Sequence, residues 1–178
     1  MPEVLLEPPA IARGLRRIAG QIAERGHGIS DLALVGIRRG GEPIARRIGD
    51  LLFELEGSRP PIGTLDITLY RDDASTALPN PRIGPSHIPF AVDGQRVILV
   101  DDVLYTGRTI RAAVDAILDY GRPRKIELAT LVDRGGRELP IHPDYVVLTS
   151  HVPTSQRIDV FEKDGDLWAV LGPPESAS

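Results

Sequence analysis

Two adjacent acidic residues follow an apolar run in the middle of the chain. Asp101 and Asp102 come directly after residues 96–100, an apolar run that predicts a buried strand. The turn at 105–109 has the sequence Tyr-Thr-Gly-Arg-Thr and leads into a predicted helix over 109–120. Such a turn can direct backbone N–H groups, threonine hydroxyls and the positive end of a helix dipole at one phosphate. Because the upstream carboxylates could accept hydrogen bonds from vicinal sugar hydroxyls, the string fits a ribose 5-phosphate.

A plainer interpretation is that the two aspartates only end a strand and that Thr109 only caps a helix. For either piece alone this interpretation would be the better one, but the combined string favours phosphate binding. The Gly-x4-Gly-Lys loop of ATP-binding proteins is absent, and so is a dinucleotide fingerprint. The turn therefore predicts a phosphate site of a different kind.

Apolar segments alternate with amphipathic ones along the chain. The strands are predicted at 32–37, 62–70, 96–100 and 126–132, with shorter candidates at 145–148, 159–161 and 167–171. Helices are predicted over 11–22, after Pro43 and over 109–120. Strands separated by helices favour a parallel sheet covered on both faces, and ligands bind where such strands end. We find no internal repeat and no linker, so a single domain over 1–178 is expected.

Composition excludes several classes of protein. The chain has 178 residues, a formal net charge of -4 and no cysteine, which excludes disulfide frameworks and thiol nucleophiles. Its first residues lack the pattern of a secretory signal, and no apolar stretch is long enough to cross a bilayer. We therefore expect a cytoplasmic protein with no membrane partner. Because 19 of the 21 basic residues are arginine, phosphate contacts by local arginines are also expected.

Five segments of the sequence resemble one known family. They are LDITLYRDD at 65–73, VILVDDVLYTGRTIRA at 97–112, GRP at 121–123, LVDRGGRELPI at 131–141 and VPTS at 152–155. Together they resemble the pyrimidine-operon regulators that double as uracil phosphoribosyltransferases, within the type I phosphoribosyltransferases. The resemblance extends from the first predicted helix to about Ser155. It implies an α/β fold with a central, mainly parallel sheet flanked by helices, a small hood and a mobile loop.

The resemblance also implies a reaction. Uracil and 5-phosphoribosyl 1-diphosphate would give UMP and diphosphate, with Mg²⁺ held indirectly by Asp101 and Asp102 through substrate or water. The catalytic residues would be Asp101, Asp102, Arg38, Arg39 and Arg71. The phosphoribosyl diphosphate would bind at Val103, Leu104, Tyr105, Thr106, Gly107, Arg108, Thr109, Gly40 and Gly41, and the base would bind at Val132, Asp133 and Arg134. A homodimer or a larger homo-oligomer is implied as well.

The resemblance places the diphosphate loop at residues 36–41, but the sequence does not assign the arginine of this loop that contacts diphosphate. The familiar family order, Thr-Arg-Gly, would place the arginine at the position that Gly40 occupies here. Arg38 and Arg39 are therefore both candidates for the diphosphate contact. An ordinary strand-to-helix turn with two solvated arginines is the alternative interpretation.

A second implied activity is binding of the messenger-RNA leader of a pyrimidine operon. Its candidate residues are Arg13, Arg16, Arg17, Arg137 and His142. Gly136 replaces the histidine that we expect before Arg137, and His142 replaces an arginine, so RNA binding is expected to be weakened, altered or lost. A solvated helix face is an equal interpretation of the first three arginines. The functional alternatives are a regulator that uses the nucleotide site only as a sensor and a phosphoribosyltransferase for a purine base.

Overall fold

A parallel sheet of five strands forms the centre of the computed structural model, which describes residues 2–68 and 86–173. The strand order is β3-β2-β4-β5-β6, and all four pairings are parallel. The strands are β2 (Leu32–Ile37), β3 (Ile62–Leu65), β4 (Arg96–Leu104), β5 (Lys125–Asp133) and β6 (Tyr145–Thr149). Their carboxyl ends meet at one edge of the sheet, where ligands bind in folds of this class.

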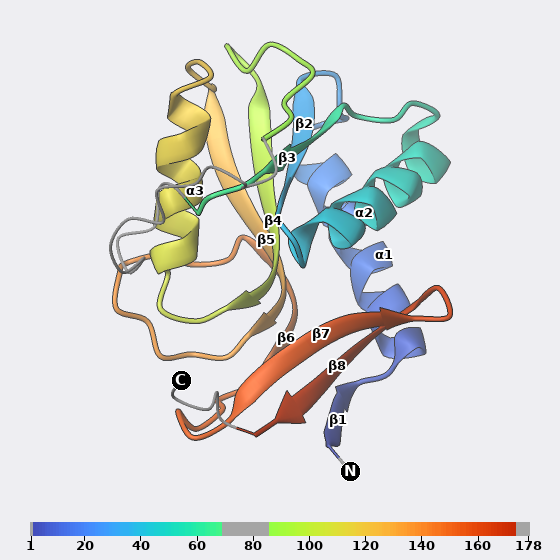
Figure 1. The fold of residues 1–178 in the computed structure, drawn as a ribbon. Coiled ribbons are helices and arrows are strands. Elements are labelled where there is room, and N and C mark those ends of the chain that lie inside the picture. The colour runs from blue at the N-terminus through green and yellow to red at the C-terminus, as the bar shows by residue number, and fades with distance from the viewer. Residues whose placement is uncertain (1, 69–85, 174–178) are drawn as a thin grey trace.

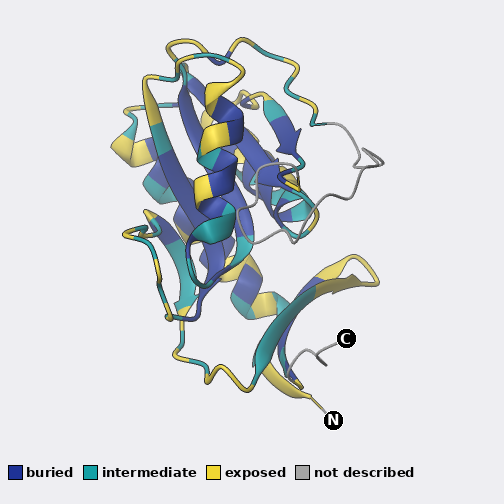
Figure 2. Cartoon of the chain, turned by 60° about the vertical axis from the view of Figure 1, so that its left-hand side comes forward, coloured by how far each residue is buried: buried dark blue, intermediate teal, exposed yellow. Residues whose placement is uncertain are grey.

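Helices cover both faces of this sheet (Figure 1). One face carries α1 (Pro8–Arg25) and α2 (Gly41–Glu56), and the other carries α3 (Arg108–Leu118). Each helix buries an apolar stripe, such as Ile11, Leu15, Ile18 and Ile22 on α1. The central strands β2, β4 and β5 are largely buried, while the edge strand β6 is only partly buried (Figure 2). This confirms the predicted α/β architecture with a parallel sheet between layers of helix.

A second, antiparallel sheet of three strands forms the hood. It has the order β1-β8-β7, with β1 (Glu3–Leu6), β7 (Arg157–Lys163) and β8 (Asp166–Gly172). The hood lies near the carboxyl end of β4, and β7 contacts β4 (Figure 1). Arg47 connects α2 to the hood: its side chain donates a hydrogen bond to the Gly165 carbonyl and pairs with Glu162 at 3.5 Å. The hood thus sits over the edge of the sheet where the predicted site lies.

Three local predictions need correction. The strand predicted at 62–70 ends at Leu65, and residues 66–68 lie outside it. The loop predicted from Asp101 onward is wrong for its first part, because β4 continues to Leu104 by pairing with β5 as far as Asp133. This pairing places the two aspartates inside the strand end and not in a turn. Strand β1 was not predicted from the sequence, since its four residues pair only with β8, which is distant in the chain.

The amino edge of the parallel sheet holds a buried polar cluster. Arg96, Glu127 and Tyr145 are each at most 3% exposed. The Arg96 guanidinium pairs with Glu127 and donates to the Tyr145 hydroxyl at 2.7 Å, and that hydroxyl donates to Glu127 at 2.8 Å. Arg96 also donates to the Ile22 carbonyl at 3.0 Å. Each charged group therefore has its partners within the core.

The cluster shifts the pKa values of its members. Burial by itself raises the pKa of Glu127, but hydrogen bonds from Arg96 and Tyr145 outweigh burial, and this pKa lies below its ordinary value. Burial by itself lowers the pKa of Arg96. The hydrogen bonds and charges of Glu127 and Tyr145 together raise this pKa by more, so it lies above its ordinary value. Both groups are held in their charged forms.

Candidate active site

The loop between β2 and α2 lies directly against the end of β4. A Cβ atom added to Gly40 would lie 2.1 Å from Asp102 Oδ2, and one added to Gly41 would lie 2.0 Å from the Val100 carbonyl oxygen. Only glycine permits so close an approach. The peptide bond between Arg38 and Arg39 in this loop is cis. The predicted diphosphate loop and the predicted sugar-binding acids therefore adjoin each other.

The two aspartates have different surroundings. Asp101 is 6% exposed, and its Oδ1 accepts the Asp102 backbone N–H at 2.9 Å. Asp102 is half-buried, and its Oδ1 accepts the Val103 backbone N–H at 2.8 Å. Asp102 forms no ion pair with any residue in the described ranges 2–68 and 86–173. Its other oxygen, Oδ2, lies at Gly40, so Asp102 is the carboxylate better placed for a ligand.

The predicted phosphate loop enters α3 through Gly107. This residue caps the helix with φ 92°, a conformation that favours glycine. The Arg108 backbone N–H donates to Thr106 Oγ1 at 3.2 Å, and the Arg111 N–H donates to the Gly107 carbonyl at 2.9 Å. The loop therefore has the tight turn and helix start that the sequence predicts for a phosphate site.

Residues 134–141, here called the clasp, hold this loop from outside. The Arg134 N–H donates to the Leu104 carbonyl at 3.1 Å, and the Glu138 N–H donates to the Thr106 carbonyl at 2.9 Å. Arg108 Nε donates to Glu138 Oε2 at 3.0 Å. The clasp thus fixes the phosphate loop at both of its ends.

Arg137 makes the central contacts of the clasp. Its guanidinium donates to the Tyr105 carbonyl and the Ile141 carbonyl, each at 2.7 Å, and to Asp133 Oδ2 at 2.8 Å. The side chain is 20% exposed. Sequence reasoning placed Arg137 on an RNA-binding surface and missed these contacts, because only the tertiary fold brings its acceptors together. Its role in RNA binding stays a prediction.

The residues predicted to bind the base are largely buried. Val132 is fully enclosed, and Asp133 accepts the Gly135 N–H at 3.0 Å in addition to the Arg137 bond. Arg134 is 5% exposed and lies over the Tyr105 ring, with 4.0 Å between guanidinium carbon and ring centre. Both charged side chains therefore have partners within the chain, and their contact with a base stays a prediction.

The two candidate arginines of the diphosphate loop differ in their contacts. Arg38 donates its backbone N–H to the Leu65 carbonyl at 2.8 Å, and its Nε lies 3.8 Å from Glu42 Oε2. Arg39 is exposed and forms no ion pair with a residue that the structure describes. Arg71, the third predicted cation, lies outside the described residues.

The other predicted RNA contacts lie on α1 and in the loop before β6. Arg13, Arg16 and Arg17 are exposed on α1. Arg17 donates to the Val146 carbonyl at 3.0 Å, and Arg16 pairs with Glu54 at 3.5 Å. His142 is exposed in the loop before β6. These side chains lie at the surface, as an RNA contact or a solvated face would both require.

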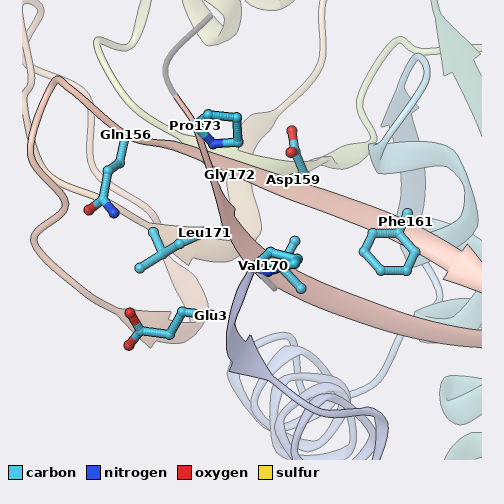
Figure 3. Close-up of a pocket in the computed structure, with 9 residues that line it drawn as sticks. Glu3, Gln156, Asp159, Phe161, Val170, Leu171, Gly172 and Pro173 are labelled. Atoms are coloured by element: carbon cyan, nitrogen blue, oxygen red, sulfur yellow. The ribbon is translucent and has the colours of Figure 1, made fainter.

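A hollow of about 790 Å³ lies away from this site, on the hood (Figure 3). Its walls come from the ends of β1, β7 and β8, and its polar residues are Glu3, Gln156 and Asp159. It contains none of the predicted site residues. In the described part of the chain, no group of three or more metal-ligating side chains is present, and no helix is long and apolar enough to span a membrane.

Comparison with known proteins shows the family to which the chain belongs. The family model for the phosphoribosyl transferase domain matches residues 3–164. A bifunctional PyrR protein of Pelotomaculum thermopropionicum is 53% identical over 171 residues, covering 94% of this chain and 93% of its own. The chain belongs to the PyrR family of phosphoribosyl transferases. A PyrR protein of Thermus aquaticus is 51% identical over 176 residues, covering 94% of this chain and 96% of its own.

Solved structures support the fold of this PyrR family member. A hypoxanthine phosphoribosyltransferase of Trypanosoma cruzi has a TM-score of 0.71 at 18% identity, covering 97% of both chains. One from Staphylococcus aureus has a TM-score of 0.67 at 18% identity, covering 85% of this chain and 79% of its own. The predicted type I phosphoribosyltransferase fold is thereby confirmed.

Proposed function

We propose that this PyrR family member transfers a phosphoribosyl group from 5-phosphoribosyl 1-diphosphate to uracil, giving UMP and diphosphate. The observation that carries the proposal is the contact between the diphosphate loop and the acidic pair, with Asp102 Oδ2 against Gly40. The phosphate loop leaves the same strand end three residues later. One substrate could thus reach all three features with its diphosphate, its ribose hydroxyls and its 5-phosphate.

The residues would act mainly by positioning and by electrostatic stabilisation. In the transfer, a bond forms between uracil N1 and the anomeric carbon, the bond from that carbon to the diphosphate oxygen breaks, and the N1 proton is lost. Asp101 and Asp102 would accept hydrogen bonds from the ribose hydroxyls, and the turn 105–109 would hold the 5-phosphate. A fixed ribose presents its anomeric carbon to the base, which reduces the entropy that the transfer must lose.

Arg39 is the better candidate for the diphosphate contact. Arg38 lies near Glu42, while Arg39 is exposed and has no ion pair with a described residue. A guanidinium beside the departing diphosphate stabilises the negative charge that develops there. The Arg39 side chain would therefore support the leaving group, and Arg38 would shape the loop.

The acidic pair also suits Mg²⁺. Two adjacent carboxylates offer hard oxygen atoms, and Mg²⁺ is a hard cation that keeps much of its water and is held largely through substrate phosphates. Asp101 and Asp102 would hold such an ion indirectly, through substrate or water. Bound Mg²⁺ neutralises part of the diphosphate charge.

A homodimer or a larger homo-oligomer is part of this proposal as well.

A spectrophotometric assay tests which base the protein accepts as substrate. Wild-type protein with Mg²⁺ and 5-phosphoribosyl 1-diphosphate should form UMP from uracil, and it should turn over hypoxanthine and guanine far more slowly. No turnover on uracil would refute the proposal. Faster turnover on a purine base would support the alternative of a purine phosphoribosyltransferase.

We infer further that binding of a pyrimidine-operon leader RNA is weakened, altered or lost in this family member. Gly136 has φ 81°, and a Cβ atom there would lie 2.4 Å from Tyr105 Cε1, so a histidine could not take this place without moving the ring. Arg137 is engaged by three acceptors within the chain. A filter-binding titration with a leader RNA should therefore give weak affinity. Nanomolar affinity that uridine nucleotides increase would contradict this inference.

A further inference from the structure

Arg134 is a buried arginine whose contacts all lie within the protein. Its guanidinium stacks on the Tyr105 ring at 4.0 Å, and its Nη2 donates to the Pro153 carbonyl at 3.0 Å and the Val152 carbonyl at 3.3 Å. Its Nε is buried and has no hydrogen-bond partner in the described structure. The resemblance to the family places this residue at the base, but its main contact here is an aromatic ring of the phosphate loop.

Tyr105 is held on two sides. Arg134 covers one face of the ring, and the backbone of Gly136 borders its edge, with only 2.4 Å between Tyr105 Cε1 and a Cβ atom built on that glycine. Tyr105 is itself only half-buried and lies outside both apolar cores. Its position therefore depends on the clasp and not on general core packing.

The placement of Tyr105 affects the turn that follows it. Thr106 and Gly107 come next in the chain, and the N–H groups at the start of α3 depend on the geometry of that turn. Backbone donors bind a phosphate well only if they are already held in the bound geometry, because ordering them on binding costs free energy. Loss of the stack would remove the side-chain contact that holds this turn in addition to its backbone hydrogen bonds.

We propose that Arg134 is a positioning residue for the 5-phosphate, acting through its stack on Tyr105. This inference rests on the proposed function, since it takes the turn 105–109 as the phosphate site. It differs from direct base recognition in a measurable way. Loss of the stack should lower the affinity for a nucleotide, which carries the phosphate, more than the affinity for a nucleoside. Loss of a base contact should lower both affinities equally.

Titration calorimetry with UMP and with uridine separates the two roles. Wild-type protein should bind UMP more tightly than uridine. In Arg134→Gln the affinity for UMP should fall about tenfold, because the turn must then be ordered when UMP binds, while the affinity for uridine changes less than twofold. The control is Arg124→Gln, an exposed arginine paired with Asp31 at the opposite edge of the sheet, which should change neither affinity.

The second variant removes the ring and leaves the arginine. Tyr105→Leu should reproduce the selective loss of UMP affinity, and Tyr105→Phe should recover most of it because the phenyl ring keeps the stack. If Arg134→Gln fails to fold, this pair of variants decides the question by the same criterion. An unchanged affinity for UMP in Arg134→Gln and Tyr105→Leu, or an equal loss for UMP and uridine, would overturn the inference. Wild-type protein that binds no UMP would refute the proposed function before any variant is made.

Discussion

The two edges of the parallel sheet use charged residues in opposite ways. At the amino edge, Arg96 and Glu127 are buried and satisfy each other together with Tyr145. At the carboxyl edge, Asp102 lies near the end of β4 and Arg39 lies in the adjacent loop between β2 and α2, and neither forms an ion pair with a described residue. A charged group that is already paired stabilises the fold, while one without an ion pair can bind a charged or polar substrate. With the proposed function, the amino edge of the sheet contributes to stability and the carboxyl edge to chemistry.

The largest expected effect comes from the acidic pair. Replacing both Asp101 and Asp102 with asparagine should lower kcat/KM for UMP formation by about 1000-fold or more. Each carboxylate is proposed to stabilise the charge that develops on the ribose in the transition state. The asparagine side chains keep an oxygen for the N–H contacts, so the thermal midpoint should change little. Steady-state kinetics and thermal unfolding of the same samples check both statements. Full activity would mean that the ribose contact is assigned to the wrong residues.

At the amino edge the effect should fall on stability. Glu127→Gln leaves the buried Arg96 charge without its partner and should lower the free energy of unfolding by about 3 kcal/mol. The kcat of the folded protein should stay within twofold of wild type. Urea denaturation measures the change, and Arg124→Gln, which removes only an exposed pair, should cost about 0.5 kcal/mol. Loss of kcat in folded Glu127→Gln would contradict the separation of the two edges.

The same cluster makes a pH prediction. Because the pKa of Glu127 is lower in the folded state than its ordinary 4.5, its contribution to stability is present above that pH and is lost as the pH falls through the folded-state value. Wild-type protein should therefore lose more stability between neutral and acidic pH than Glu127→Gln does. Parallel slopes of unfolding free energy against pH in the two proteins would rule out this contribution.

The diphosphate loop allows a comparison of two neighbouring arginines. Arg39→Gln should raise the KM for 5-phosphoribosyl 1-diphosphate about tenfold, the effect of removing one charge-assisted contact. In Arg38→Gln the main expected change is in stability, because Arg38 lies near Glu42. Initial-rate kinetics distinguish the two. A larger effect on KM in Arg38→Gln would reverse the assignment.

The same substitution, glycine to alanine, should have different effects at Gly40 and at Gly20. A methyl group at Gly40 would meet the Asp102 carboxylate, so Gly40→Ala should reduce kcat/KM about tenfold by displacing that side chain. Gly20 lies inside α1 with no atom within 4 Å of an added Cβ. Gly20→Ala should raise stability by about 0.5–1 kcal/mol and leave kinetics unchanged. Equal kinetics in the two variants would show that Gly40 does not position Asp102.

Much of this arrangement could be predicted from local sequence. The apolar run before Asp101 predicts the strand, and the turn at 105–109 predicts the helix start that the structure shows at Arg108. The end of β4 was placed too early, because its last residues are held by pairing with β5, and such pairing leaves no mark in a single stretch of sequence. Periodicity reports which face is buried and not how far a partner strand extends.

The contacts of arginines were the hardest to predict. Arg96 and Glu127 stand within apolar strands, and a charge at such positions is the one signal that could have indicated a buried pair. Arg134 and Arg137 carry no such signal, because their partners in the clasp and the phosphate loop come together only in the tertiary fold. The motif thus predicts which loops form the site but not the contacts between these loops.

In the proposed reaction, the carboxyl edge of the sheet couples diphosphate release to attack by uracil. The most direct test follows the reaction of wild-type protein by phosphorus NMR, with Mg²⁺ and 5-phosphoribosyl 1-diphosphate, before and after uracil is added. Diphosphate and UMP should appear together in equal amounts, and only once uracil is present. Intact 5-phosphoribosyl 1-diphosphate in the presence of uracil, or diphosphate released at the same rate without any base, would contradict the claim.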